Sequence, residues 1–280
     1  MNRTTSAKTR PPKPSTPNAF KTLSRVGLVL FTAACGWVCF LTLANPPLAT
    51  TLQGWPETIL LLTGALTILL SLGAQLPAQN VILAATLIAV IGGGIHAVGA
   101  LANLPFGPFI YTSAAGPAFF ETLPWWIPLI WITFILSSRA MARLILRPWR
   151  RLRAYGFWLI GVTLILTLLL DLAFEPFASK LHHYWIWSPT KLPLLWCLTP
   201  MSNFLGFTTT TLLILMVTTP SLINKSQNRF GPQYAPALVW LLLNALMISS
   251  AVQNKFWPAV VLVGAGIVVT SMLAVRGARW

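Results

Sequence analysis

Acidic residues are rare in this chain, and their positions are therefore informative. Only four of the 280 residues are Asp or Glu, whereas 19 are Lys or Arg and 56% are hydrophobic. Asp171 and Glu175 stand at the end of a long apolar run, and Glu121 lies in a segment rich in Pro and Trp. An ionisable group near the apolar part of a bilayer is costly and persists mainly where it has a partner or a function. These three carboxylates therefore indicate a site, whereas the isolated Glu57 is predicted to cap a helix.

Asp171 and Glu175 are four residues apart, so in a helix they share one face. Pro176 follows, and the helix is predicted to end there. Two carboxylates this close repel, and a protonated acid beside an ionised one is a common acid/base arrangement. In the alternative, structural interpretation, Glu175 is solvated at the membrane interface and Asp171 pairs with a loop group. We predict catalytic roles for both residues.

Four further polar residues could belong to a site. His96 follows a run of three glycines within an apolar segment, where it could either act in a site or bond to a closely packed neighbouring helix. Asn203 is a polar group in a later apolar segment and could hold a water molecule. His182 and His183 are adjacent, without the spacing of a metal site, and no metal is expected.

Large aromatic residues gather around two segments of the chain. Interfacial aromatic belts are common in membrane proteins and could account for them. Their concentration in two segments instead favours an aromatic-walled cavity, whose π-faces can stabilise a cation. The residues are Trp125, Trp126, Trp131, Tyr184, Trp185 and Trp187.

Apolar runs of about 20 residues recur along the chain, and each can cross a hydrocarbon core of about 30 Å as a helix. The sequence therefore predicts an all-α, polytopic transmembrane helical bundle of about eight spans. The fourth run is the shortest and contains two prolines, so that a kink or a partly re-entrant segment is predicted there. The runs cover 26–45, 58–76, 81–102, 124–140, 154–174, 196–217, 235–252 and 256–275.

Basic residues fall almost entirely on one side of the predicted membrane. With a cytosolic N-terminus, only Lys180, Lys191 and Lys255 lie outside the cytosolic side. Because an excess of Lys and Arg marks cytosolic loops, both termini are predicted to be cytosolic, in a multi-pass protein of the cytoplasmic (inner) membrane. Orientation accounts for the net charge of +15, and no nucleic-acid partner is expected.

Residues 1–24 are predicted to form a disordered, basic cytosolic tail, followed by a single transmembrane domain over residues 25–280. The arginines between 139 and 153 recur at helical spacing, which predicts a helix lying on the membrane surface against anionic headgroups. The non-cytosolic connections 103–123 and 175–195 are long, aromatic and broken by Gly and Pro. They are predicted to fold back onto the bundle.

Six short strings occur in a fixed order over about residues 105–207. They are Gly107-Pro-Phe-Ile-Tyr111-Thr112, Gly116-Pro117, Pro124-Trp125-Trp-Ile-Pro128-Leu-Ile-Trp131, Asp171-Leu-Ala-Phe-Glu175-Pro176, Trp185-Ile-Trp187 and Pro200-Met-Ser-Asn203-Phe204-Leu-Gly206. This ordered set resembles the integral-membrane carotenoid-biosynthesis family, of which the carotenoid 1,2-hydratases and bisanhydrobacterioruberin hydratases are members. Here Ser113 stands where the family often has an acid, Glu175 stands in place of Asp, and Phe207 stands in place of Trp.

The resemblance implies a cofactor-independent hydratase that acts on the terminal C1=C2 double bond of an acyclic carotenoid end. Asp171 would protonate C2, and water held by Glu175 and Asn203 would attack the cation at C1. Tyr111 would position the end group or the water, and the lipophilic carotenoid would enter from the bilayer. Trp185, Trp187 or Trp125 would face the cation, and Glu121 and His96 are further predicted substrate-binding residues.

Two other functions remain open at this point. A non-catalytic carotenoid-binding or assembly protein would use the same aromatic segments. A small-molecule permease would also have many spans and a polar site near the midplane, but it should show repeat symmetry and paired broken helices, which are not evident in the sequence.

Overall fold

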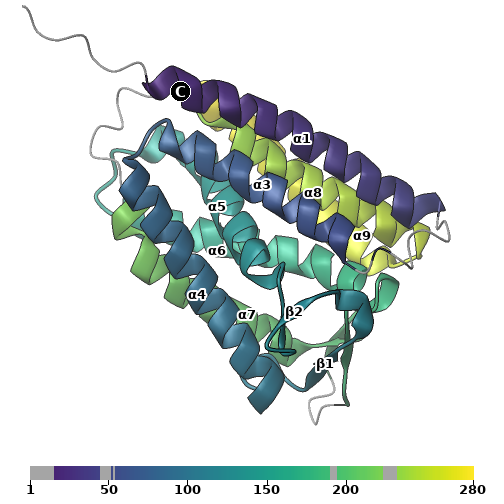
Figure 1. The fold of residues 1–280 in the computed structure, drawn as a ribbon. Helices are drawn as coiled ribbons and strands as arrows, with labels where there is room; N and C mark the ends of the chain where they lie inside the picture. Colours follow the sequence, from purple (N-terminus) through teal and green to yellow (C-terminus); the bar gives the residue numbers. More distant parts are fainter. Residues whose placement is uncertain (1–15, 45–51, 53, 190–193, 223–231) are drawn as a thin grey trace, which may run out of the picture.

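A computed structural model describes residues 16–44, 52, 54–189, 194–222 and 232–280 of the chain (Figure 1). Eight of its helices are long and apolar enough to cross a membrane, which confirms the predicted all-α, eight-span bundle. The orientation of the termini stays a prediction. The helices are α1 (Thr16–Ala44), α3 (Trp55–Gly73), α4 (Ala78–Ala102), α5 (Ile127–Ile145), α6 (Tyr155–Glu175), α7 (Met201–Thr218), α8 (Tyr234–Gln253) and α9 (Trp257–Ala278).

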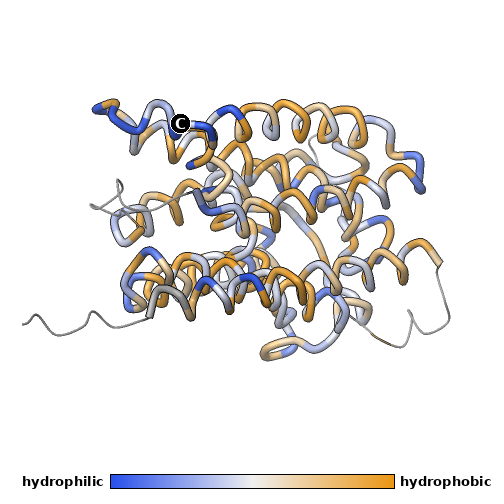
Figure 2. The backbone as a smooth tube through the Cα atoms, turned by 90° about the horizontal axis from the view of Figure 1, so that it is seen from above, coloured by the Kyte–Doolittle hydropathy of each residue, from blue (hydrophilic) through white to orange (hydrophobic). Residues whose placement is uncertain are grey.

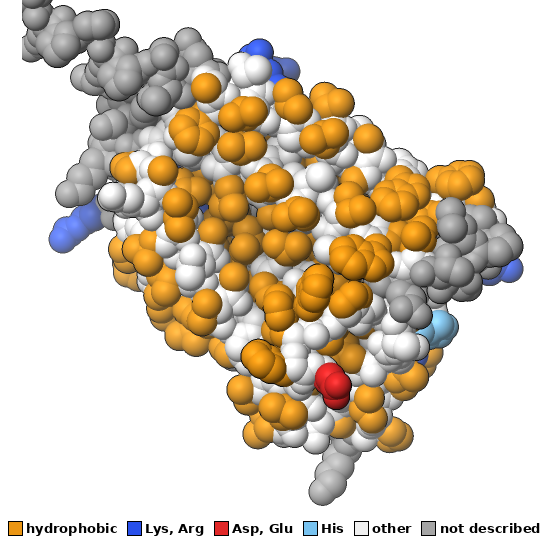
Figure 3. All heavy atoms as spheres, in the orientation of Figure 1, with side chains coloured by type: hydrophobic (Ala, Val, Ile, Leu, Met, Phe, Trp, Pro, Cys, Tyr) orange, Lys and Arg blue, Asp and Glu red, His pale blue; other side chains and the backbone are white. Residues whose placement is uncertain are grey.

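The outer surface of the bundle is suited to lipid. The helices are apolar along most of their length, and hydrophobic side chains cover most of the face seen in Figure 3 (Figures 2 and 3). Phe157 and Val29, for example, are 81% and 68% exposed. Large apolar side chains exposed at this frequency are expected of a surface that meets hydrocarbon rather than water.

Helix α5 forms the centre of the bundle and packs against α3, α4, α6, α8 and α9. Its side chains are buried on nearly every side, including Trp131, Phe134 and Ile135. The predicted kink or re-entrant segment is wrong. Pro124 lies before the helix and Pro128 lies in its first turn, where proline disturbs no backbone hydrogen bond.

Two predictions near the ends of spans also need correction. Helix α1 begins at Thr16, inside the range predicted for the tail, and residues 1–15 lie outside the described residues. The predicted surface helix over the arginines is wrong as well. Helix α5 continues to Ile145, and a 3-10 turn at Arg147–Trp149 and further turns lead to α6. Arg139 therefore belongs to a buried span.

The connections on one end of the bundle form a small folded layer (Figure 1). Strand β1 (Phe109–Tyr111) pairs antiparallel with β4 (Trp185–Trp187), so that two segments distant in sequence lie side by side. Both strands alternate, with the middle isoleucine outward and the aromatic residues inward. This confirms that the two aromatic connections fold back onto the bundle. Two shorter pairs complete the layer: β2 (Ala118–Phe119) with β3 (Leu123–Pro124), and β5 (Leu195–Trp196) with β6 (Thr199–Pro200).

The sequence predicted that the helix ends at Pro176, but the chain remains helical beyond that residue. The α-helical part of α6 ends at Glu175, but a π-helical segment continues over Pro176–Leu181. The proline lacks a backbone N–H, and the wider π turn is one way to continue without that donor. The segment carries the chain toward β4, and so connects the two acids of α6 directly to Trp185 and Trp187.

Candidate active site between helices α4, α5, α6 and α7

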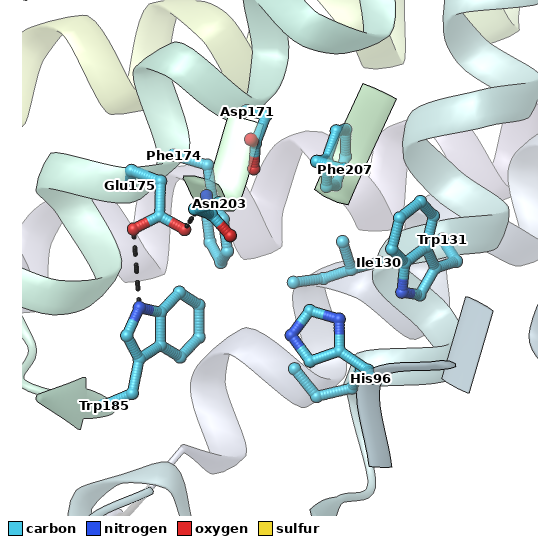
Figure 4. A pocket seen from close by; sticks show the side chains of 10 residues that line it. His96, Ile130, Trp131, Asp171, Phe174, Glu175, Trp185, Asn203 and Phe207 are labelled. Atoms are coloured by element: carbon cyan, nitrogen blue, oxygen red, sulfur yellow. Dashed lines mark hydrogen bonds between the residues drawn. The ribbon is translucent and has the colours of Figure 1, made fainter. Parts of the chain in front are cut away.

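A small cavity lies between four helices and the strand layer (Figure 4). Its enclosed space is about 10 Å³, room for the centre of about one water molecule. Figure 4 shows Glu175 on the opposite side of the group from His96 and Trp131. The lining residues are His96, Ile127, Ile130, Trp131, Asp171, Phe174, Glu175, Trp185, Asn203 and Phe207.

The Glu175 carboxylate is held by four hydrogen-bond donors. Its Oε1 accepts from Asn203 Nδ2 at 2.9 Å. Its Oε2 accepts from the Trp187 and Trp185 indoles at 3.2 and 3.4 Å. Thr199 Oγ1 donates to Oε2 as well, at 3.1 Å. An ionised carboxylate only accepts hydrogen bonds, so four donors favour the ionised form and oppose the effect of burial on a side chain that is just 3% exposed.

The local fold explains why these donors converge. Trp185 and Trp187 are two residues apart in β4, and the strand alternation therefore points both indoles to the same side. Thr199 lies in β6, directly before α7, and Asn203 lies in the first turn of that helix. Glu175 thus meets donors from one strand, from a second strand and from the start of a helix.

Asp171 differs sharply from Glu175. It lies one turn earlier on α6 and is also 3% exposed, but its buried Oδ2 has no hydrogen-bond partner among the described residues. His96 Nδ1 and Trp131 Nε1, on other walls of the cavity, are also buried without partners there. Buried polar atoms without partners are rare and mark places where a ligand or water binds.

Aromatic rings form much of the cavity wall. Trp131 stacks on Phe207 with ring centroids 4.6 Å apart, and Phe174 meets Trp185 edge-on at 5.8 Å. Behind this wall Trp126 stacks on Trp185 at 6.1 Å and donates to the Ala115 carbonyl at 2.8 Å. The negative π-faces of such rings attract positive charge, more strongly where water is excluded.

Tyr111 stands in β1 directly opposite Trp185 and does not line the cavity. Its hydroxyl is buried and has no partner among the described residues, and its ring lies 6.5 Å from that of His96. Burial and, second, the charge of Glu175 raise the pKa of Tyr111 well above 10. The hydroxyl is therefore a neutral donor at any physiological pH.

The sequence matches the carotenoid biosynthesis protein family over residues 56–274. The chain belongs to this family. The matched region contains the cavity, both acids of α6 and all the strands of the layer. No curated protein and no solved structure matches the chain.

Two predicted site residues of this carotenoid biosynthesis protein lie away from the cavity. Glu121 is exposed, with a backbone φ of 58°, at the turn between β2 and β3. Trp125 is 43% exposed and packs on Trp55 and Phe119. The adjacent Trp126 is the buried one, because the chain turns into α5 there and only one of the two indoles can face inward.

Several residues that the structure brings to the site were not predicted from the sequence. Thr199 gives no signal in the sequence, since its role follows from the pairing of β5 with β6. Phe207 and Phe174 are single aromatics within apolar helices, where a hydrophobic residue is unremarkable. Trp131, by contrast, is among the aromatic residues that the sequence predicts to wall a cavity, and a Cβ added at Gly92 in the glycine run would overlap its ring. The glycine allows the indole to lie against α4.

The fourth acid of this family member is buried as well. Glu57 lies in the first turn of α3, as predicted for a cap, but it is only 7% exposed and accepts a hydrogen bond from Tyr184. His182 Nδ1 lies 3.9 Å from its carboxylate. Burial, and secondly His183, lower the pKa of His182 to about 4, so this contact is not an ion pair at neutral pH.

Proposed function

We propose that this protein adds water to the terminal C1=C2 double bond of an acyclic carotenoid end. The observation that carries the proposal is the contrast between the two acids of α6. Glu175 is held by four donors, whereas Asp171 faces the same cavity with an oxygen that has no partner in the described part of the chain. Membership of the carotenoid biosynthesis family supplies the class of substrate.

Asp171 is the proposed general acid. With Glu175 held in its ionised form one turn away, a second negative charge at Asp171 would be repelled in a space that excludes water. Asp171 therefore carries the proton and donates it to C2 of the double bond. The electron pair of the double bond forms the new C2–H bond and leaves a tertiary cation at C1.

The rings around the cavity stabilise this cation. Trp185, Trp131 and Phe207 all contribute to the wall. The indole N–H of Trp185 points to Glu175, which fixes the plane of the ring and leaves its face available. The negative charge of Glu175 adds a further electrostatic contribution. Preorganised groups of this kind often supply the largest part of catalysis.

Water then attacks C1. Among the described residues, Oε1 of Glu175 accepts from Asn203 alone, so it retains a lone pair for a water molecule. A proton of the water passes to Glu175 as the C1–O bond forms. Transfer of that proton to Asp171 restores both acids, and the overall reaction consumes one water without an oxidant or reductant.

The substrate reaches the site from the bilayer. The outer surface of the bundle is apolar and suits a lipophilic carotenoid. The cavity holds about one water molecule, and so the aromatic side chains of its wall move apart when an end group enters. The small resting cavity keeps bulk water out, which prevents loss of the Asp171 proton.

Co-expression with a pathway that makes acyclic-ended carotenoids tests the proposal. Mass analysis of the pigments should show the gain of one water with the wild type and no gain with Asp171→Asn. Glu121→Gln is the matched control, because Glu121 is an exposed acid outside the cavity. Unchanged pigment mass with the wild-type protein present in the membrane would contradict the hydratase. Pigment co-purification would then support the binding-protein alternative.

A further inference from the structure

Arginines gather at the end of the bundle opposite the cavity. Arg139 and Arg143 lie one turn apart near the end of α5, Arg150 lies in the following turn, and Tyr155 begins α6. We call these four residues the arginine cluster. Helices α5 and α6 pack against each other, and the short connection between them keeps these residues together at one end of the bundle.

Arg139 is the most deeply buried member, at 4% exposed. Its Nη2 donates to the Leu222 carbonyl at 3.2 Å, which places the guanidinium beside the short 3-10 turn Pro220–Leu222 after α7. Its Nη1 is buried and has no hydrogen-bond partner among the described residues. The planar guanidinium therefore has donors left to bind a further group.

No Asp or Glu side chain balances this charge. The four acidic side chains all lie at the other end of the bundle, at the start of α3, between β2 and β3, and at the end of α6. Arg147 is close to the cluster in sequence. Like Arg139, it has a buried Nη1 with no hydrogen-bond partner in the described part of the chain. Helix α6 also has no side-chain cap at its amino end, so its dipole adds positive potential at Tyr155.

Two ordinary explanations account for part of this arrangement. Basic residues mark the cytosolic side of a membrane protein, and an arginine in the last turn of α5 complements the helix dipole. Both explanations apply to arginines in water, such as the exposed Arg151 and Arg153. Neither explains why Arg139 is buried with no acidic side chain beside it, which is unfavourable unless a partner of opposite charge is supplied.

We propose that the arginine cluster binds a phosphate group, supplied by the headgroup of an anionic phospholipid at this face of the bilayer. Arginine pairs with phosphate through two parallel N–H···O bonds, and Tyr155 provides a further donor. The half-buried Arg143 and Arg150 lie at the mouth of the cluster and the buried Arg139 at its base. The site is separate from the cavity, and the inference does not depend on the proposed hydratase.

Lipid binding to the purified full-length protein tests the site. We would measure the thermal unfolding midpoint in detergent, and the masses of lipid-bound protein by native mass spectrometry. Each is measured with phosphatidylglycerol and with phosphatidylcholine, in which a choline cation compensates the charge of the phosphate. Phosphatidylglycerol should raise the midpoint and remain bound, and phosphatidylcholine should do so much less. Inorganic phosphate and diphosphate are tested in parallel as soluble sources of the same chemistry.

Two double variants distinguish binding at a specific site from attraction to the overall positive charge. Arg143→Gln with Arg150→Gln removes the mouth of the cluster, whereas Arg151→Gln with Arg153→Gln removes the same charge from exposed neighbours. The first pair should weaken phosphatidylglycerol binding at least about ten-fold, and the second should leave it within about two-fold, because phosphate contacts are charge-assisted. Arg139 is left unchanged, since its loss could prevent folding.

The outcomes separate clearly. Equal losses in both double variants, or equal stabilisation by both lipids, would overturn the site. A response to soluble phosphate but not to lipid would keep the phosphate assignment and identify a soluble ligand. No response to lipid or to soluble phosphate would reject the proposal altogether.

Discussion

Asp171 and Glu175 lie one turn apart on α6 and are equally buried, yet Glu175 accepts four hydrogen bonds while Asp171 Oδ2 accepts none within the described structure. The two acids therefore differ in what they contribute to the folded state. The hydrogen bonds of Glu175 stabilise the loop layer, whereas Asp171 is retained at an energetic cost. Such a cost is typical of residues kept for function.

Substitutions at the two acids should separate stability from activity. Glu175→Gln replaces an acceptor by an amide that also carries donors, and it should lower the free energy of unfolding by about 1.5–3 kcal/mol for each charge-assisted bond lost. Asp171→Asn should leave the thermal midpoint unchanged or higher. In both variants the rate of pigment conversion should fall by about 10²-fold or more. Thermal unfolding in detergent beside pigment analysis checks this, and a strongly destabilised Asp171→Asn would contradict the assignment.

The indole donors can be tested without removing an aromatic ring. Trp185→Phe keeps much of the wall but removes one donor to Glu175, so conversion should fall by about ten-fold with a stability loss of about 1.5–3 kcal/mol. Trp125→Phe is the matched control, because Trp125 is 43% exposed and outside the cavity. Equal effects of the two substitutions on conversion would argue that the cavity is not the site.

The glycine run of α4 offers a paired test of how the cavity is built. A Cβ at Gly92 would overlap the Trp131 ring, whereas a Cβ at Gly94 would have no neighbour within 4 Å. Gly92→Ala should therefore displace Trp131 and destabilise the protein by about 1–3 kcal/mol. Gly94→Ala should be neutral or slightly stabilising, since alanine favours the helix. Tryptophan fluorescence and thermal unfolding measure both, and tolerance of Gly92→Ala would refute the close contact.

Acidification should weaken the fold through His182. Its pKa is about 4 in the folded protein against 6.5 for the ordinary side chain, so the unfolded chain binds a proton first as the pH falls. Stability should be constant above about pH 6.5, fall between about pH 6.5 and 4, and lose at most about 3 kcal/mol from this group. His182 faces Glu57, Tyr184 and Thr42, and its burial and the neighbouring His183 together disfavour the protonated form.

Thermal midpoints between pH 7.5 and 4.5 measure this dependence. His182→Gln should flatten the profile, whereas His183→Asn, at an exposed position with positive φ that asparagine tolerates, should keep the wild-type shape. A profile that His182→Gln leaves unchanged would assign the acid sensitivity to another group.

The sequence predicted best what depends on local pattern. Eight apolar runs gave the eight spans, and the four-residue spacing placed Asp171 and Glu175 on one face. Trp185 and Trp187 are two residues apart, which puts their side chains on the same side only if the segment is a strand, as β4 is.

Contacts between distant segments were much harder to predict. Helix α5 is apolar on nearly every side, so periodicity does not show which face meets α4 or α6. Trp125 and Trp126 are adjacent in a turn, where no period selects the buried one. The arginines of 139–153 fit a surface helix as well as the end of a span. Only the bundle shows that Arg139 is inside.

Helix α5 meets protein along nearly its whole length, and its mean hydropathy is the lowest of the eight spans. It is nevertheless synthesised before α6, α8 and α9, its later neighbours in the bundle. Transfer from water into lipid alone favours membrane insertion of such a segment only weakly. Biogenesis of the protein therefore requires α5 to wait at the insertion machinery until later helices emerge. A chain that stops just after Ile145 should fail to anchor its last span, although every residue of that span is present.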